Sequence, residues 1–311
     1  MDEEEFQLVT IVLVAFNQEQ YIKEAVESAF SQVYSPLEII LSDDCSVDST
    51  YLIMAKMVDE YNGPHSVILK RNEKNLGIVA HFSRCVELSN GEFVVGFAGD
   101  DISLPDRVSE MYQAWTESGK TATSLFSNSV MIDENGVESD LWFASPPIYS
   151  KNIDDFISSR RCWLLGCAHA FNKSIFTKYG RIHPKIMQED GALSFRALLE
   201  GGIIYVDKVL VKYRRHSNNV FNLGDTSKKI KLLKHEYYMK KGWQYDAERS
   251  DVKDEHLTKI LKRECVKSFL IKTINSIPYI SIFYHEMISD SLVNSIKKIR
   301  NIVFKLRTIN K

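Results

Sequence analysis

The sequence predicts an α/β fold in which a doubly wound, mixed sheet carries helices on both faces. Apolar runs rich in β-branched residues recur at 8–14, 37–41 and 92–98, as in strands buried on both faces. The segments between these runs place apolar residues at helical spacing, and the connections are short. Strands and helices that alternate in this way are typical of a largely parallel sheet.

The first 120 residues supply most of the predicted sheet. The strand at 8–14 precedes a helix over 17–32 that has Ile22, Ala25, Val26 and Ala29 on one face. We expect the later elements in this order: a strand at 37–41, a helix from Asp48, a strand at 67–69, a helix over 78–88 and a strand at 92–98. The connections are short enough for each helix to lie against the sheet.

The pattern becomes mixed from about residue 121 and helical after Gly224. Between these points we predict strands at 124–126, 203–206 and 209–211, and helices over 154–160 and 191–200. The sequence after Gly224 is rich in lysine and has the composition of appended helices. We therefore divide the chain into regions 1–120, 121–222 and 223–311.

Composition excludes several classes of protein. A hydrophobic content of 44% over 311 residues predicts a soluble protein with a large core, and a net charge of −2 argues against general nucleic-acid binding. Five cysteines without a Cys-x-x-Cys pair indicate reduced thiols rather than a zinc site or a disulfide framework. The acidic N-terminus does not resemble a signal peptide, and no run approaches the ~20 apolar residues of a membrane span. We expect a cytoplasmic protein.

Polar residues gather where the predicted strands end. The first strand ends at Ala15 and Asn17, the second at Asp43 and Asp44, and the strand at 92–98 at Asp100 and Asp101. Ligands of open α/β sheets bind beyond these carboxyl ends, and Mg²⁺ or Mn²⁺ is often held by one or two carboxylates together with substrate phosphates. The segment after the first strand, 17–20, has neither a dinucleotide fingerprint nor a P-loop. These features favour a nucleotide held by carboxylates and a metal ion.

Six ordered motifs resemble glycosyltransferase family 2 over roughly residues 8–219. They are the strand 12–17 with its terminal Asn; 41–50, similar to D-D-G-S-x-D-x-T; Arg71 with the Asn-x-Gly segment 75–77; Gly99-Asp100-Asp101 at the D-x-D position; Gln188-Glu189-Asp190, similar to the E-D motif; and 213–216, similar to Y-R-x-H. The order and spacing of all six identify the chain as a member of this family.

The resemblance implies a GT-A fold and an inverting transfer of sugar from a nucleotide-sugar, with a UDP-sugar as the expected donor. Region 1–120 would bind the donor, and region 121–222 would bind a glycan or lipid-linked acceptor. The implied donor-binding residues are Ala15, Asn17, Asp43, Asp44, Arg71, Asp100 and Asp101. Asp190 would be the catalytic base, Asp100 and His216 would hold Mn²⁺ or Mg²⁺, and Glu189, Trp163 and Arg215 would support the acceptor side.

Two residues depart from the family pattern. Cys45 stands where the nucleoside motif usually has Gly, a change that affects the turn. Ala98 stands where the first Asp of D-x-D falls, so Asp100 is the remaining carboxylate, with Asp101 beside it. Two alternatives follow: a metal ion relies on the diphosphate and His216, or the reaction needs no metal.

Each candidate residue also has a purely structural interpretation. One of Asp43 and Asp44 could only shape a turn, and Asp101 and Asp190 could cap helices. Arg71 and His216 could be solvated surface groups. Trp142 and Trp163 are more typical of a core than of a sugar platform.

The apolar stripe from Leu292 to Leu306, which alternates with Lys and Arg, predicts an amphipathic helix at the C-terminus. Such a helix packs on its own domain, joins a homodimer or lies on an anionic membrane surface. Two rival functions also remain open. A nucleotidyltransferase that makes the nucleotide-sugar would need a basic, Gly-rich loop after the first strand, and a non-catalytic carbohydrate-binding protein would not need both Asp100 and Asp190.

Overall fold

A mixed sheet is the centre of the fold. The computed structural model describes residues 7–149, 152–159, 164–217, 219, 226–252 and 254–275. Within this part of the chain, nine strands form one sheet in the order β3-β2-β1-β4-β8-β6-β9-β5, and β7 pairs with β6. The strands are β1 (Val9–Ala15), β2 (Leu37–Asp43), β3 (Ser66–Arg71), β4 (Phe93–Ala98), β5 (Ile102–Ser103), β6 (Ser124–Ile132), β7 (Glu138–Leu141), β8 (His169–Asn172) and β9 (Ile203–Arg214).

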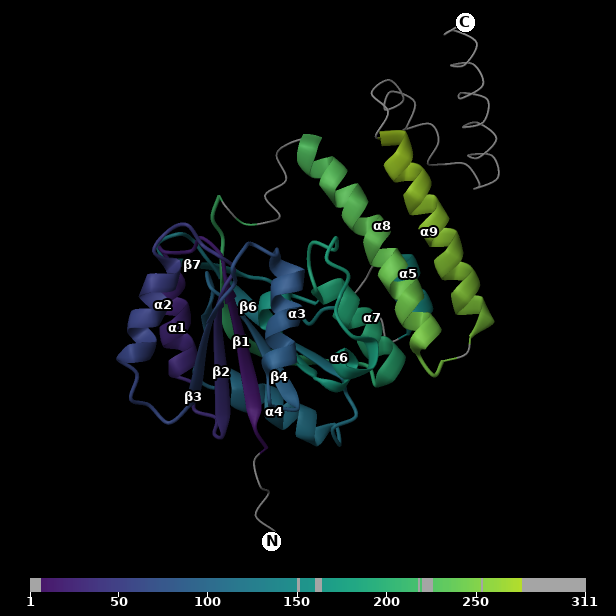
Figure 1. The fold of residues 1–311 in the computed structure, drawn as a ribbon. Helices are drawn as coiled ribbons and strands as arrows, with labels where there is room; N and C mark the ends of the chain where they lie inside the picture. Colours follow the sequence, from purple (N-terminus) through teal and green to yellow (C-terminus); the bar gives the residue numbers. More distant parts are fainter. Residues whose placement is uncertain are drawn as a thin grey trace, which may run out of the picture.

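Helices cover both faces of this sheet, as the sequence predicts (Figure 1). They are α1 (Ile22–Phe30), α2 (Thr50–Asp59), α3 (Ile78–Leu88), α4 (Arg107–Glu117), α5 (Ile153–Ser159), the 3-10 helix η1 (Gly166–Ala168), α6 (Ser174–Tyr179), α7 (Asp190–Glu200), α8 (Thr226–Arg249) and α9 (Glu255–Asn275). Alternate residues of β1 point to opposite faces. Ile11 therefore packs in the core under α1, α2 and α4, whereas Val12 packs in the core under α3 and α7.

The first four strands run parallel and end together. In β1, Ala15 pairs with Asp43 of β2, and Val14 pairs with Ala98 of β4. The β-branched and aliphatic side chains of β1 and β2 are almost all buried, which explains their continuous apolar runs. Three carboxyl ends therefore meet at one edge of the sheet, as predicted.

The second half of the sheet is mixed. β8 is antiparallel to both β4 and β6, whereas β9 is parallel to β6 and antiparallel to β5. The two strands predicted at 203–206 and 209–211 are one long strand, β9, because its pairing with β6 continues to Arg214 through two irregularities. This length brings the end of β9 next to β5, which follows Asp101 directly.

The predicted C-terminal helices are present as α8 and α9, which lie side by side (Figure 1). Met239, Trp243, Leu257 and Leu261 belong to the same buried cluster as the α7 residues Leu193 and Phe195. This part of the C-terminal region therefore packs on the domain. The stripe from Leu292 to Leu306 lies outside the described residues. Among the described residues, no helix is long and apolar enough to cross a membrane.

Candidate active site

The two aspartates after β2 have different surroundings. Asp44 accepts hydrogen bonds from Asn72 Nδ2 at 2.7 Å and from the backbone N–H groups of Leu76 at 2.9 Å and Gly77 at 2.9 Å. Asp43 Oδ2 accepts one from the backbone N–H of Ser46 at 3.0 Å, but its buried Oδ1 meets no donor within the described residues. Asp44 therefore holds the 72–77 loop, and Asp43 retains a free acceptor.

A second set of contacts shapes the loop after Asp44. Asn17 Oδ1 accepts from the backbone N–H of Val47 at 2.9 Å, and the backbone N–H of Asn17 donates to Ser46 Oγ at 2.8 Å. The carbonyl of Ala15 accepts from the N–H of Asp44 at 2.9 Å. Cys45 adopts φ 63°, in the left-handed region where glycine is favoured. The turn of the family motif is thus kept although its glycine is missing.

Arg71, at the end of β3, reaches this loop. Its Nη2 donates to the carbonyl of Ser46 at 2.9 Å, its Nε lies 3.3 Å from Asp43 Oδ2, and its guanidinium stacks 4.8 Å from the centre of the Tyr51 ring. The side chain is 45% exposed, so one face remains open to a ligand. Arg71 and Asp43 therefore form one polar surface at the ends of β2 and β3.

The structure brings Asp100 and His216 together. His216 Nε2 lies 2.9 Å from Asp100 Oδ2, and the imidazole packs at a tilt against Tyr21 with ring centroids 5.0 Å apart. The two side chains come from positions 116 residues apart, after β4 and after β9. The long strand β9 makes this contact possible.

Asp101 has a different role from its neighbour. Its Oδ1 accepts a hydrogen bond from the backbone N–H of Arg214 at 2.8 Å, and the Cys167 thiol is a further partner. Burial, and then the charge of Asp100, raise the pKa of Asp101 well above its usual value. Asp101 therefore ties the end of β9 to the β4–β5 turn.

Arg214, which the sequence analysis did not select, organises this corner. It is buried; its Nε donates to the carbonyl of Asp100 at 2.9 Å, and its Nη2 pairs with Glu24 of α1. Its guanidinium stacks 4.9 Å from the Tyr21 ring centre. Arg215 is exposed and contacts the β6 carbonyl of Ile132 only through its backbone N–H. Arg214 could have been identified from the sequence as the arginine of the Y-R-x-H pattern.

The donor set fits a divalent cation that also contacts phosphate. Asp100 Oδ2 and His216 Nε2 are close enough to contact one ion. The described residues contain no group of three or more His, Cys, Asp and Glu side chains arranged for a metal, and Ala98 offers no ligand. Mg²⁺ and similar hard ions commonly complete such sites with substrate phosphates and water.

Asp190 begins α7 and lies in a buried, acidic environment. Its Oδ1 accepts from the backbone N–H of Gly191 at 2.6 Å, and Gln188 is a second hydrogen-bond partner. Burial, with a smaller effect from the Glu189 charge, raises the pKa of Asp190 to about 8. Burial also raises the pKa of Glu189. A carboxyl with such a pKa is suited to take up a proton near neutral pH.

The short helix η1 connects the base to the strand ends. A Cβ on Gly166 would lie 3.0 Å from Glu189 Oε1 and 4.0 Å from Asp190 Oδ2, so glycine leaves room for both acids. The next residue, Cys167, contacts Asp101. The short helix η1 therefore lies between Asp190 and the loop that carries Asp100 and Asp101. No recognisable motif in the sequence marks Gly166.

Of the two tryptophans that could serve as sugar platforms, the structure describes one. Trp142 is 41% exposed and packs edge-on against Tyr213, with ring centroids 5.3 Å apart. Trp163 lies outside the described residues. Trp142 thus presents an exposed aromatic surface next to the 213–216 segment.

Solved structures with similar folds bind nucleotide-sugars. The crystal structure of Staphylococcus aureus TarS 1–349 in complex with UDP-GlcNAc matches with a TM-score of 0.61 at 17% identity, covering 85% of this chain and 72% of the TarS 1–349 chain. The mannosyltransferase PcManGT from Pyrobaculum calidifontis, in complex with GDP-Man and Mn²⁺, matches with a TM-score of 0.56 at 14% identity, covering 96% and 80%. These matches confirm the predicted GT-A-like α/β fold.

Sequence comparisons give the family. The Mycobacterium tuberculosis protein Rv1520 is 23% identical over 71% of this chain, and the match spans 62% of its own length. The Bacillus subtilis protein named "Putative glycosyltransferase EpsE" is 30% identical over 42% of this chain and 45% of its own. The family model described as "Glycosyl transferase family 2" matches residues 10–180, more than half of the chain. The chain therefore belongs to glycosyl transferase family 2.

Proposed function

We propose that the protein transfers a sugar from a nucleoside-diphosphate sugar to a hydroxyl group of an acceptor, with inversion at the anomeric carbon. The observation that carries this proposal is the separation of Asp190 from the Asp100–His216 pair by one short helix, η1. A buried carboxyl with a raised pKa thus lies near a pair suited to a metal-bound diphosphate. Family membership and the nucleotide-sugars bound by TarS and PcManGT support the same reaction.

The donor would bind at the ends of β1, β2 and β3. Asp43 Oδ1 is buried and has no hydrogen-bond partner among the described residues, so it would accept a hydrogen bond from an N–H of the nucleobase. Arg71 would face the nucleotide with its exposed side, and Asn17 and Ala15 would hold the loop that encloses it. We expect a UDP-sugar, as in the TarS complex.

The diphosphate would lie at Asp100 and His216. These two residues would hold Mn²⁺ or Mg²⁺, which would neutralise the charge of the departing diphosphate when bound. Asp101 would not contact the ion, since its oxygen is used by Arg214. Arg214 and Tyr21 would keep Asp100 and His216 in place through the contacts described above.

Asp190 would be the general base. The acceptor hydroxyl gives its proton to the Asp190 carboxylate while its oxygen forms a bond to the anomeric carbon, and the bond from that carbon to the phosphate oxygen breaks. Attack from the face opposite the leaving group inverts the configuration. A base in this position contributes roughly 10²–10⁴-fold to the rate.

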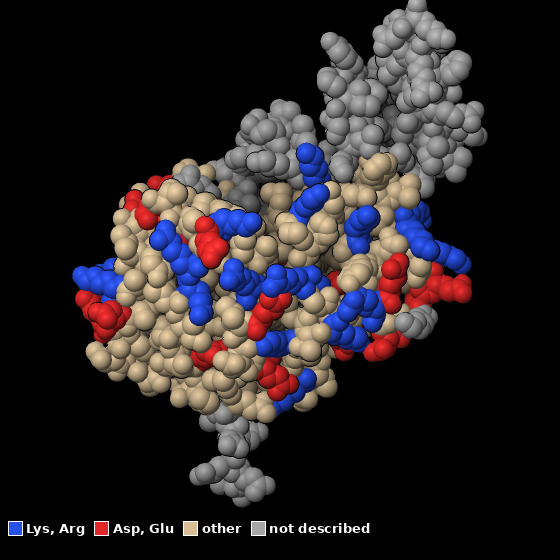
Figure 2. All heavy atoms as spheres, in the orientation of Figure 1, with Lys and Arg blue, Asp and Glu red and all other residues tan. Residues whose placement is uncertain are grey.

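We further propose a glycan or lipid-linked oligosaccharide as acceptor, in the synthesis of a bacterial surface polysaccharide such as O-antigen or capsule. The enzyme would work in the cytoplasm, at the inner face of the membrane for a lipid-linked acceptor. Figure 2 shows Lys and Arg side chains spread over the face that includes α3 and α8, with Asp and Glu among them. Because both signs of charge are present, this face by itself does not select an anionic surface.

The test is a panel of UDP-, GDP-, dTDP- and CMP-sugars with Mn²⁺, with water or simple glycosides as acceptors. We expect release of the nucleoside diphosphate from one donor and, with a glycoside, a product of inverted anomeric configuration by NMR. Pyrophosphate formation from a sugar phosphate and a nucleoside triphosphate would instead indicate a nucleotidyltransferase. Binding without release under all conditions would indicate a non-catalytic protein.

A further inference from the structure

Helix α8 contacts both sides of the segment that presents Asp190. This segment, the base loop, comprises residues 183–191 and connects α6 to the first turn of α7. The matched family region ends at residue 180, so the base loop and α8 lie beyond it. Within the loop, the N–H of Ile186 donates to the carbonyl of His183 at 2.9 Å. Further hydrogen bonds join the loop to α8.

His235 of α8 holds the start of the loop's last turn. Its Nδ1 accepts a hydrogen bond from the backbone N–H of Met187 at 2.9 Å. Burial lowers the pKa of His235 to about 4, so the ring is neutral near pH 7 and Nδ1 remains an acceptor. Met187 is followed by Gln188, whose side chain is hydrogen-bonded to Asp190. His235 thus fixes the backbone of Met187, the residue next to Gln188, and Gln188 is a hydrogen-bond partner of Asp190.

Trp243, eight residues later on α8, holds the other side. Its Nε1–H donates to the carbonyl of Gly191 at 3.1 Å, and its indole stacks on Phe195 with ring centroids 5.3 Å apart. Gly191 is the residue whose backbone N–H donates to Asp190 Oδ1. Gly191 lies in the first turn of α7 and has no side chain of its own, so the indole adds to the restraint from the helix.

Further contacts hold α8 against the base loop and α7. Arg196 of α7 forms a buried ion pair with Asp246 of α8, with Nε and Oδ2 2.9 Å apart, and also donates to the carbonyl of Gly180 at 2.8 Å. A Cβ on Gly242 would lie 3.4 Å from Ile186 Cδ1. The helix therefore approaches the base loop along a continuous line from His235 to Asp246.

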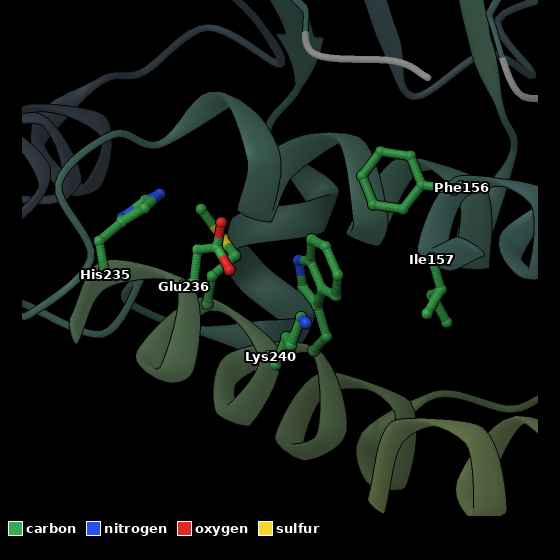
Figure 3. Close-up of a pocket in the computed structure, with 7 residues that line it drawn as sticks. Phe156, Ile157, His235, Glu236 and Lys240 are labelled. Carbon is green, nitrogen blue, oxygen red and sulfur yellow. The ribbon is translucent and has the colours of Figure 1, made fainter. Parts of the chain in front are cut away.

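A small hollow lies beside the two contacts. Figure 3 shows His235, Glu236 and Lys240 along α8, with Phe156 and Ile157 on the opposite side; Met239 and Trp243 complete the lining. Its volume of about 20 Å³ has room for about one water molecule, too little for a sugar. His235 and Trp243 are both buried beside it, so their ends of the hydrogen bonds to the base loop are shielded from bulk solvent.

We infer that His235 and Trp243 are positioning residues for the catalytic base, and that α8 is a working part of the active site. This inference rests on the proposed role of Asp190. Each of the two residues fixes the backbone next to a hydrogen-bond donor of Asp190, one at Gln188 and one at Gly191. Loss of either contact would let the carboxylate turn away from the acceptor hydroxyl without changing the donor site.

The test uses Trp243→Phe, which removes the N–H and keeps an aromatic ring, and His235→Leu, which removes the acceptor. We expect kcat for nucleoside diphosphate release to fall roughly tenfold in each variant, the effect of one net hydrogen bond, with donor KM unchanged. The midpoint of the pH–rate profile should move to higher pH, because weaker hydrogen bonds to the carboxylate raise its pKa. Among the described residues, Glu189 is the acidic group whose charge also raises the pKa of Asp190.

Two further variants make the result specific. His235→Asn offers an amide oxygen in place of Nδ1 and should recover part of the lost rate. Lys240→Met breaks the ion pair of α8 with Glu264 of α9, at 3.1 Å, and should leave the pH midpoint unchanged. An unchanged kcat and pH midpoint in folded Trp243→Phe, while Asp190→Asn is slow, would overturn the positioning role alone. Normal transfer by Asp190→Asn would overturn the proposed base itself.

Discussion

The donor side of the site and its base loop are stabilised in different ways. At the ends of β1 and β2, motif residues hold one another: Asn17 bonds Val47, and Asp44 bonds Asn72 and Gly77. The base loop is held from outside its motif, by α8 about fifty residues further along the chain. The proposed nucleotide site is therefore built from short motifs, whereas the position of the proposed base depends on tertiary packing.

The adjacent acids of the two regions also differ. At the donor side, each pair has one aspartate bound into the fold and one open: Asp44 beside Asp43, and Asp101 beside Asp100. At the base loop, Asp190 is buried and Glu189 is half-buried with its Oε2 buried, and burial of the carboxyls raises the pKa of both. Each donor-side pair thus leaves one aspartate for a ligand, whereas burial at the base loop favours a carboxyl that accepts a proton.

The first test of this comparison concerns the proposed metal site. Asp100→Asn removes a charge that would face the cation, so we expect affinity for a nucleoside diphosphate in Mn²⁺ to fall at least about tenfold, measured by calorimetry. Asp101→Asn is the matched control, since its amide oxygen still accepts from the N–H of Arg214. Equal loss of affinity in both variants would mean that the two aspartates share the ion.

A similar pair of variants separates binding from folding at β2. Asp43→Asn should weaken nucleotide binding about tenfold through a lost charged hydrogen bond, with little change in melting temperature. Asp44→Asn should lower the free energy of unfolding by about 1–3 kcal/mol, because its amide faces N–H donors. Chemical denaturation and calorimetry check the two effects. The reverse assignment would follow if Asp44→Asn lost affinity while Asp43→Asn lost stability.

The smallest effect is expected at Cys45. Its φ of 63° is strained for a residue with a side chain, so Cys45→Gly should stabilise the protein by up to about 1 kcal/mol. Nucleotide affinity should stay the same, because the turn is already formed. Thermal melts with and without a nucleoside diphosphate measure both quantities. Cys45→Ala, which keeps the strain, should show no such gain, and a stability increase in that variant would contradict this explanation.

The sequence predicted the first half of the fold well because its strands are buried on both faces. The helix expected over 78–88 is α3 at the same bounds, and the strand ends meet as predicted. Helix α4 was missed although Val108, Met111 and Trp115 are buried at helical spacing, a signal that was present. β8 was missed for a physical reason: its four residues include His169 and Asn172, and its burial comes from lying between β4 and β6.

For the site, the motifs identified the carboxylates and His216 but not the residues that hold these side chains in place. Which of Asp43 and Asp44 stays open depends on the 72–77 loop, and the role of Asp101 depends on where β9 ends. His235 and Trp243 belong to a lysine-rich helix that has no motif. Contacts between residues far apart in the sequence decide these roles, so a pattern of residue types does not reveal them.

The most direct test of the central proposal is the pH dependence of kcat for nucleoside diphosphate release by the wild type and by Asp190→Asn. The base is active when ionised, and its pKa in the folded protein is about 8, so the wild-type rate should rise as pH increases through about 8. In Asp190→Asn we predict a rate at least roughly 10²-fold lower, without this limb, and donor affinity close to that of the wild type. A variant that retains both the rate and the limb would contradict the assignment of Asp190 as the base.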